Sequence, residues 1–352
     1  MSSDSWKCSW PREKRSTVLE FEGKEDVLIC SSVQLRRNYG DLPFYGKLSD
    51  GQKAELNARA VTALADGDVS VEKLSADTPL TFEDMLASAA FSSAGDFAAE
   101  ARIVTEERPR VRVALGPDDQ LSITVVTRGN ALKAALEAAN GAEELLSQGG
   151  SFAFDKNWGY LTAGVVHTGN AASAAYLLHL QGLGRLEKMP DITNELKEKN
   201  LEVRPLLTAE GLNAEFYCVV TRENLGKSTS QVFAEAEQAV SELVVRERAA
   251  REELIYDDMD RYADDVMRAM GLLLNARLMD FDELIDIYGD VRAGLTGGLL
   301  TGNLRELDNF VYGLSPFRMG EEFEGLSSRD EELIRADRVR RKFGESIVIK
   351  KI

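Results

Sequence analysis

The chain contains few of the residues from which metal sites, disulfides and histidine-dependent catalytic groups are built. Its 352 residues include two histidines and three cysteines. Cys8, Cys30 and Cys218 lie far apart and form no Cys-x-x-Cys pair, so we expect neither a disulfide framework nor a structural zinc site. With only His167 and His179, a histidine-rich metal site cannot be built, and a Ser-His-Asp triad has few options.

Long apolar runs and an excess of positive charge are also absent. No run is long enough to cross a membrane, and the start, MSSDSWKCSWPREKR, lacks the apolar centre of a signal peptide. Acidic residues outnumber basic ones 59 to 42, which gives a formal net charge of −17. Phosphate backbones and anionic lipids repel such a chain, which disfavours general binding to nucleic acid or membrane. We therefore expect a soluble, cytoplasmic protein in a reducing compartment.

The hydrophobic pattern divides the chain into three parts. From 49 to 99, apolar residues recur three or four positions apart, which predicts helices with N-caps at Ser49 and Thr81. The middle mixes β-branched runs with amphipathic segments, and the chain after Tyr256 is almost entirely helical in pattern. We therefore expect an α+β fold: a mostly helical N-terminal domain (1–100), an antiparallel sheet flanked by helices (101–255) and a helical C-terminal domain (256–352).

The clearest local signals lie in the middle part. The β-branched runs 111–115 and 121–127 flank a Gly-Pro-Asp-Asp segment, which predicts a hairpin. The glycine-rich segment 294–303 is typical of a connection between helices. The other elements predicted by periodicity are helices over 131–146 and 228–255 and strands over 151–155 and 215–223.

Taken alone, the chemically interesting residues have structural explanations. His179 is predicted to be a core or helix-end residue, whereas His167, in a Gly/Thr-rich loop, is open to either a structural or a functional role. Cys218 lies in a predicted strand, as a small buried hydrophobic residue does. The Asn-Leu-Gly-Lys-Ser segment that ends at Ser228 is no phosphate-binding loop, because Thr221 stands where that loop needs glycine. We therefore expect Ser228 to cap the following helix.

A longer-range pattern extends over several segments in a fixed order. They are ALKAALEAAN (131–140), WGYLTAGVVHTGNAASAAYLLHLQGL (158–183), LEVRPLL (201–207), NLGKS (224–228), RERAARE (246–252), DDVMRAMGLLLNARLM (264–279) and DVRAG (290–294). Together they resemble the ATP:guanido phosphotransferases, and within that family the bacterial protein-arginine kinases, over roughly residues 27–340. The resemblance implies a guanido-kinase-like fold, to whose cleft the strand segment 27–38 contributes. It also implies transfer of the ATP γ-phosphoryl group to a guanidinium.

The phosphate-binding arginines of this family fall mostly on neutral residues. The segment CSSVQLRRN aligns with the family's Ser-Arg-x-Arg motif, so that Ser32 and Gln34 stand in place of two arginines. Ser122 stands in place of a third arginine, and Ser173 in place of a fourth. Of the five positions that the resemblance implies, only Arg204 keeps its arginine.

The catalytic carboxylate of the family is also missing. In the segment GPDDQLS, Pro117 takes the place of the catalytic glutamate, and Asp118 and Asp119 follow it. A second carboxylate position aligns with Ala209, or with Glu210 if one residue is inserted. Because proline cannot act as a base, no catalytic group implied by the resemblance is intact.

These replacements favour a catalytically silent relative that acts as a regulatory or scaffolding protein. Such a protein is expected to need no cofactor. Its partner would be a protein, such as an active arginine kinase or the clients of that kinase, and not nucleic acid or a membrane. The resemblance also implies a homodimer.

Two other functions remain open. The first is an active ATP-dependent arginine phosphotransferase with a rebuilt site, which would use ATP and Mg²⁺. Its carboxylate would come from Asp118, Asp119 or Glu210, and its phosphate-binding groups would be Arg36, Arg37, Arg128 and Arg204.

The second is a module that binds phosphoarginine or another guanidinium compound. The helical domain of the bacterial kinases binds phosphoarginine through an Arg-Asp-x-x-Arg-Ala motif. Here Arg329 and Asp330 are separated from Arg335 by two extra residues. Two residues turn a helix by about 200°, so the two halves of the motif face different directions.

Overall fold

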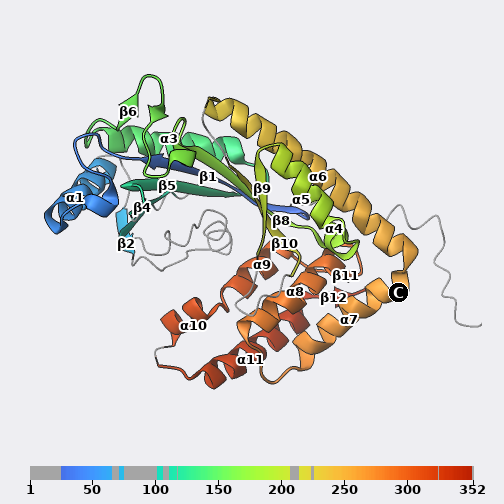
Figure 1. Ribbon diagram of the computed structural model, residues 1–352. Coiled ribbons are helices and arrows are strands. Elements are labelled where there is room, and N and C mark those ends of the chain that lie inside the picture. Colours follow the sequence, from blue (N-terminus) through green and yellow to red (C-terminus); the bar gives the residue numbers. More distant parts are fainter. Residues whose placement is uncertain are drawn as a thin grey trace, which may run out of the picture.

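A computed structural model describes residues 25–65, 71–74, 101–105, 111–116, 118–206, 214–222, 226–323 and 325–350. Its central element is an eight-stranded sheet in the order β2-β3-β4-β5-β1-β8-β10-β9, with antiparallel neighbours (Figure 1). The strands are β1 (Leu28–Arg37), β2 (Val71–Leu74), β3 (Ala101–Thr105), β4 (Val111–Leu115), β5 (Leu121–Arg128), β8 (Ala172–His179), β9 (Leu201–Pro205) and β10 (Phe216–Thr221).

Two groups of helices pack against opposite faces of this sheet (Figure 1). One group supplies the first hydrophobic core: α1 (Asp50–Ala65), α3 (Leu132–Ser147), α4 (Gln181–Arg185), α5 (Met189–Glu198) and α6 (Thr229–Asp257). The second core contains α7 (Met259–Asn275), α8 (Phe281–Thr296), α9 (Leu304–Tyr312), α10 (Pro316–Glu322) and α11 (Ser328–Ser346). Short elements complete the fold: β6 (Phe154–Asp155) with β7 (Gly159–Tyr160), β11 (Leu300–Thr301) with β12 (Val348–Ile349), and the 3-10 turns η2 (Tyr45–Lys47) and η4 (Val165–His167).

Because side chains alternate along a strand, neighbouring residues belong to the cores on opposite faces of the sheet. Val33 and Tyr176 belong to the core under α3 and α6, whereas Cys30, Leu177 and Phe216 belong to the core of the C-terminal helices. The sheet is thus covered on both sides around β8 and β10. These observations confirm the predicted α+β class, with an antiparallel sheet flanked by helices and a helical C-terminal region.

Several local predictions are confirmed. The runs on either side of Gly116 pair as the antiparallel strands β4 and β5. The predicted helices over 131–146 and 228–255 appear as α3 and α6. The Ser228 side chain accepts a hydrogen bond from the Gln231 amide, and the Gln231 side chain accepts one from the Ser228 amide, which is a complete capping box. Ser49 likewise accepts a hydrogen bond from the amide of Gln52, close to the start of α1.

Other local predictions need correction. The glycine-rich segment is not simply a connection, because α8 continues through Gly294 to Thr296 and β11 follows. The strand predicted over 151–155 covers only Phe154–Asp155. The cap predicted at Thr81 lies outside the described residues.

The two residues predicted to belong to the core are indeed buried. His179, at the end of β8, has no exposed surface and packs against the ring of Phe216. Cys218 is 2% exposed in β10, and burial raises the pKa of its thiol to about 12. At neutral pH this thiol is therefore not a nucleophile.

The sheet draws strands from both of the first two predicted domains. β1 lies at its centre between β5 and β8, and β2 lies at one edge next to β3. The segment 27–38 therefore shares one continuous sheet with the strands of the 101–255 segment. This arrangement brings the ends of β1, β5 and β8 together, where the candidate site lies.

Candidate functional site

The neutral residues predicted at phosphate-binding positions lie together on one face of the sheet. Ser32, Gln34 and Arg36 alternate along β1 and therefore project from the same face. Gln34 lies opposite Ser173 of β8, and Arg36 lies opposite Ser122 of β5. We call this set the cleft face: Ser32, Gln34, Arg36, Ser122 and Ser173.

The serines and the glutamine of the cleft face have little contact with solvent. Ser32, Gln34, Ser122 and Ser173 are 1%, 4%, 7% and 2% exposed. The hydroxyl of Ser32 donates to the Val125 carbonyl oxygen at 3.0 Å. These side chains form a polar, uncharged layer within the protein.

Gln34 is the least satisfied member of this layer. Its Nε2 lies 3.5 Å from the hydroxyl oxygen of Thr124, the outer limit of a hydrogen bond. Its buried Oε1 has no hydrogen-bond partner. An unpaired amide oxygen costs free energy in such a site, so Gln34 contributes little to stability.

Arg36 and Asp119 connect the cleft face to the loop that precedes β8. Arg36 donates to the Ser173 hydroxyl at 3.3 Å, and its Nε lies 3.9 Å from Asp119 Oδ2. Asp119 is 3% exposed and accepts hydrogen bonds from Asn38 Nδ2 and from the Ala163 amide, both at 2.8 Å. Both hydrogen bonds go to Oδ1 of Asp119, so this oxygen holds the loop, while Oδ2 faces Arg36.

The other predicted carboxylates are placed differently. Asp118 is exposed at the turn between β4 and β5. Pro117 and Glu210, as well as the alternative position Ala209, lie outside the described residues. The two described carboxylates therefore differ. Asp118 faces solvent, whereas Asp119 is buried and accepts a hydrogen bond from the loop that precedes β8.

The charges of Arg36, Asp118 and Arg204 all act on His167. Burial is the main reason that the pKa of His167 is lowered to about 4, and the positive charges of Arg36 and Arg204 add to the effect. The negative charge of Asp118 opposes it. His167 is therefore neutral at physiological pH, and its buried Nδ1 has no hydrogen-bond partner.

Arg204, the arginine that the resemblance retains, is held by a neighbour on its own strand. Its Nε and Nη2 donate to the two carboxylate oxygens of Glu202 at 2.9 and 3.1 Å. This contact raises the pKa of Arg204 and lowers that of Glu202. Glu202 was not predicted as a site residue, although the Glu-x-Arg spacing in a strand places both side chains on one face.

Two arginines considered for a rebuilt site point elsewhere. Arg37 projects from the opposite face of β1, donates to Glu143 at 2.7 Å and stacks on the ring of Tyr160 at 3.6 Å. Arg128 donates at 2.7 Å to Glu25 and to Asp308, which belongs to α9. Of the four arginines considered, Arg36 and Arg204 are the ones whose charges lower the pKa of His167.

The three residues aligned with the phosphoarginine motif, Arg329, Asp330 and Arg335, differ in their burial. All three lie in α11, where Arg335 is 2% exposed and donates to the carbonyl oxygens of Met279 and Leu314 at 2.9 Å. Arg329 and Asp330 are exposed in the first turn of the same helix. Arg335 is thus used within the C-terminal core, away from the other two.

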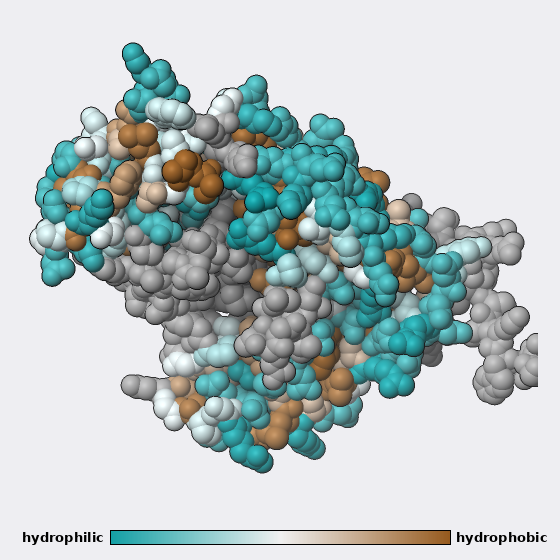
Figure 2. Space-filling view, viewed as in Figure 1, coloured by the Kyte–Doolittle hydropathy of each residue, from teal (hydrophilic) through white to brown (hydrophobic). Residues whose placement is uncertain are grey.

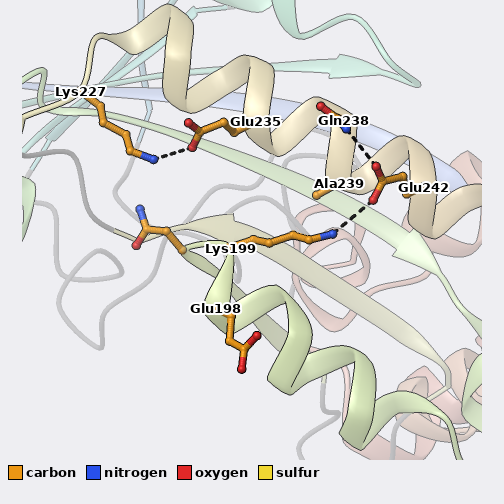
Figure 3. A pocket seen from close by; sticks show the side chains of 8 residues that line it. Glu198, Lys199, Lys227, Glu235, Gln238, Ala239 and Glu242 are labelled. Carbon is orange, nitrogen blue, oxygen red and sulfur yellow. Dashed lines mark hydrogen bonds and ion pairs between the residues drawn. The ribbon is translucent and has the colours of Figure 1, made fainter.

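Two surface cavities lie away from the cleft face, and both are lined by paired charges. The first, of about 280 Å³, lies between α5 and α6, where Lys199 contacts Glu242 and Lys227 contacts Glu235 (Figure 3). The second, of about 420 Å³, includes Arg185. Its other lining residues are Leu254, Asp258, Arg261, Tyr262 and Asp265.

The described part of the chain offers no obvious metal site and no membrane span. No group of three or more histidine, cysteine, aspartate or glutamate side chains among the described residues could hold a metal ion. None of the helices in the described ranges is long and apolar enough to cross a bilayer.

Comparisons with known proteins agree with the fold. Residues 56–250 match the model of the ATP:guanido phosphotransferase C-terminal catalytic domain. The protein-arginine kinase of Moorella thermoacetica is 27% identical over 347 residues, which cover 93% of this chain and 97% of that relative. The protein-arginine kinase of Symbiobacterium thermophilum is 27% identical over 303 residues, 83% of this chain and 85% of that protein.

Solved structures show the same architecture at lower sequence similarity. A lombricine kinase structure matches with a TM-score of 0.52 and 19% identity, over 68% of this chain and 71% of that one. The duplicated taurocyamine kinase of Schistosoma mansoni, with bound transition-state analogue components, matches with a TM-score of 0.51 and 16% identity. That match covers 73% of this chain and 40% of the duplicated one.

Proposed function

The chain belongs to the ATP:guanido phosphotransferase family, and we propose that it has lost phosphoryl transfer and acts as a regulatory or scaffolding protein. Its partners would be proteins, either an active arginine kinase or the clients of such a kinase. The observation that carries the proposal is the set of four uncharged, buried side chains on the cleft face, those of Ser32, Gln34, Ser122 and Ser173. They occupy the positions at which the family resemblance places arginines for the triphosphate.

Electrostatics supports the loss of nucleotide binding. Each charge-assisted hydrogen bond to a phosphate contributes about 1.5–3 kcal/mol, so four lost arginines remove roughly 6–12 kcal/mol. Micromolar affinity corresponds to about 8 kcal/mol in total. Arg204, the remaining arginine, would have to exchange its contact with Glu202 for a phosphate. A triphosphate therefore gains too little from this face to bind in the manner of the family.

The burial of the cleft face supports the same conclusion. A phosphate group needs donors that solvent and ligand can reach, whereas Ser32, Gln34, Ser122 and Ser173 are each less than a tenth exposed. Asp119, the best-placed carboxylate, is 3% exposed and accepts two hydrogen bonds through Oδ1. A general base has to lie within hydrogen-bond reach of the substrate, which its burial opposes.

The competing function is an active transferase with a rebuilt site. The electrostatic influence of both Arg36 and Arg204 on His167 is the observation that favours it. Two arginines could bind part of a triphosphate, and the carboxylate of Asp118 also acts on His167. The same experiment separates the two functions.

The test is calorimetric titration of the full chain with ATP and Mg²⁺, with the Moorella thermoacetica protein-arginine kinase as the positive control. We expect no binding heat and no thermal stabilisation at low-millimolar ATP. A ligand present at 100 times its dissociation constant would stabilise the fold by about 2.7 kcal/mol, which is several degrees.

Detection of arginine phosphorylation completes the test. We expect no ATP-dependent phosphoarginine above a buffer control. A signal that disappears in Arg36→Ala and Arg204→Ala variants would establish the rebuilt transferase instead. Separate titrations with phosphoarginine and free arginine test the remaining alternative, a module that binds a guanidinium compound.

A further inference from the structure

The larger of the two surface cavities lies where α6 ends and α7 begins. Its volume of about 420 Å³ is in the range of sites that bind small ligands. Three helices contribute to its lining, which consists of Arg185 from α4, Leu254 from α6, and Asp258, Arg261, Tyr262 and Asp265 from the cap and first turns of α7. Figure 2 shows a largely hydrophilic surface over the bend between α6 and α7. The cavity therefore lies at a polar junction between a helix of the first core and one of the second.

The two arginines of this cavity share one carboxylate. Arg185 donates to Asp265 Oδ2 at 2.8 Å and also to Asp290 of α8. Two carboxylates therefore neutralise Arg185, which ties α4 to α7 and α8. Arg261 lies 3.4 Å from Asp265 Oδ1, and its side chain is 75% exposed. A pair as exposed as this one contributes little, so Arg261 is easily displaced from the carboxylate.

Asp258 is the lining carboxylate that stays available. Its Oδ1 accepts a hydrogen bond from the Arg261 amide at 2.9 Å and so caps α7. No lysine, arginine or histidine among the described residues forms an ion pair with Asp258, and the residue is exposed. The cap requires an oxygen acceptor but no charge, because asparagine caps helices as well as aspartate does. The negative charge of Asp258 can therefore pair with a ligand.

The charges at this junction add up to an excess of negative charge. The basic groups that line the cavity or act on its lining and on Asp290 are Arg185, Arg251 and Arg261. The acidic groups are Asp258, Asp265, Asp286, Asp290, Glu215 and Glu247. Two neighbouring ion pairs, Lys188 with Glu253 and Arg268 with Asp264, add no net charge. A cation is therefore attracted to the cavity and an anion is repelled.

The other lining residues are apolar or already satisfied. Leu254 is partly exposed. Tyr262 is 3% exposed, and its hydroxyl donates to the carbonyl oxygen of Ala293 at 2.8 Å, so this group needs no ligand. An aliphatic chain packs on such residues while a charge at its end stays paired or hydrated.

From the volume of this cavity, its apolar residues and its negative charge, we infer that it binds a guanidinium or ammonium group carried on a short aliphatic chain, as in arginine and lysine. The cation pairs with Asp258, and the chain packs on Leu254 and Tyr262. A free basic amino acid and a basic side chain of a protein present this same chemistry, and the test separates them. The inference does not depend on the loss of catalysis, since the cavity lies away from the cleft face.

The test begins with calorimetric titration of the full wild-type chain with four compounds. N-acetylarginine amide and N-acetyllysine amide represent side chains within a protein, and free arginine represents the amino acid. N-acetylcitrulline amide has the shape of the arginine compound without its charge. We expect both cationic amides to bind at least about tenfold more tightly than the citrulline compound. Tighter binding of free arginine than of its amide assigns the amino acid as the ligand, whereas equal or weaker binding assigns a protein side chain.

Two variants should change the affinity for the cation in opposite directions. Asp258→Asn keeps an oxygen that caps α7 but loses the charge, so we expect binding about tenfold weaker. Arg261→Gln removes a competing cation, so we expect binding about threefold tighter. The matched controls are Asp264→Asn and Arg268→Gln, which alter an ion pair of the same helix outside the cavity and should stay within about twofold. The side chain of Arg268 is 75% exposed, like that of Arg261.

Circular dichroism and the unfolding temperature show whether each variant keeps the fold, and the comparison with citrulline needs no variant. The inference is overturned if the cationic amides give no heat at about 10 mM, or if the citrulline compound binds equally well. Equal affinities of the wild type and Asp258→Asn also overturn it, because the ligand then occupies another site, such as the cleft face. Weaker binding by Arg261→Gln has the same consequence. None of these compounds is a nucleotide, so this inference and the proposed loss of ATP binding can fail separately.

Discussion

Asp119, two residues after the position at which the resemblance places the catalytic glutamate, serves the fold. The residue before it, Asp118, is exposed, whereas Asp119 is buried and accepts hydrogen bonds from Asn38 and the Ala163 amide. These contacts join the end of β1 to the segment between β7 and β8. The carboxylate therefore acts as a positioning group.

We expect Asp119→Ala to lower the free energy of unfolding by about 2–4 kcal/mol, because the buried amide of Asn38 and the backbone amide of Ala163 lose their acceptor. Urea denaturation measures the change. Asp118→Ala is the matched control, since an exposed neighbour should change stability by less than about 0.5 kcal/mol. Equal effects of the two variants would show that the hydrogen bonds of Asp119 do not stabilise the fold.

His167 should make stability depend on pH in a defined window. Its pKa is lowered from 6.5 to about 4 in the folded protein, so between these values the unfolded chain binds more protons. The free energy of unfolding therefore falls as the pH drops from 6.5 towards 4, and the contribution of His167 is complete above 6.5. Because the side chain is partly exposed, we expect a loss of only about 1 kcal/mol between pH 7 and pH 5.

The His167→Gln variant isolates this contribution. Buried carboxyl groups such as Glu215 and Asp290 have raised pKa values and change stability in the opposite direction, so the total pH dependence is not informative alone. Denaturation of wild type and variant at pH 7 and pH 5 gives the difference. If both lose the same free energy on acidification, His167 does not titrate as described.

At the scale of elements, the start of α6 offers a direct test of the capping assignment. We expect Ser228→Ala to destabilise the protein by about 1 kcal/mol, because the amide of Gln231 loses its acceptor. Ser241→Ala, an exposed position inside the same helix, should change stability by less than about 0.5 kcal/mol. Chemical denaturation of both variants distinguishes a cap from a generally sensitive helix.

Turn and cap residues in the local sequence allowed many helices and strands to be predicted. Close packing between two helices explains the clearest wrong prediction, the helix break at Gly294. The Gly-Pro-Asp-Asp hairpin and the capped helix α6 have signals in adjacent residues. Gly294 was predicted to interrupt a helix, yet it lies inside α8, where a Cβ atom would come within 2.4 Å of Val266. Glycine is needed there because two helices approach closely, and nothing in the local sequence reveals that neighbour.

The candidate site was predictable in its residues but less so in its geometry. Arg36 and Arg37 are adjacent in sequence, and both were considered as phosphate-binding groups. Strand alternation sends Arg36 to the cleft face and Arg37 to Glu143 on the opposite face. Strand alternation predicts that the side chains of Arg36 and Arg37 project from opposite faces of the sheet. It does not say which of these faces also carries Ser122 and Ser173, because that depends on the strand register.

At the scale of the whole molecule, a buried ionic network connects the C-terminal helices to the sheet. Arg292 of α8 has no exposed surface and donates to Asp308 and to the carbonyl oxygens of Glu25 and Asp26, just before β1. Arg128 of β5 binds the other oxygen of Asp308. The helical part therefore depends on charges that are satisfied only when it packs on the sheet.

We expect Arg292→Met to cost about 3–5 kcal/mol, because it removes one partner from a buried charged network while Asp308 stays buried. Arg268→Met is the control, since Arg268 pairs with Asp264 on the surface of α7 and its side chain is 75% exposed. Denaturation followed by fluorescence and by circular dichroism measures both variants. If the network joins the two parts, the Arg292 variant should lose stability and its two transitions should separate. A loss no larger than that of Arg268→Met would mean that hydrophobic packing alone holds the helical part on the sheet.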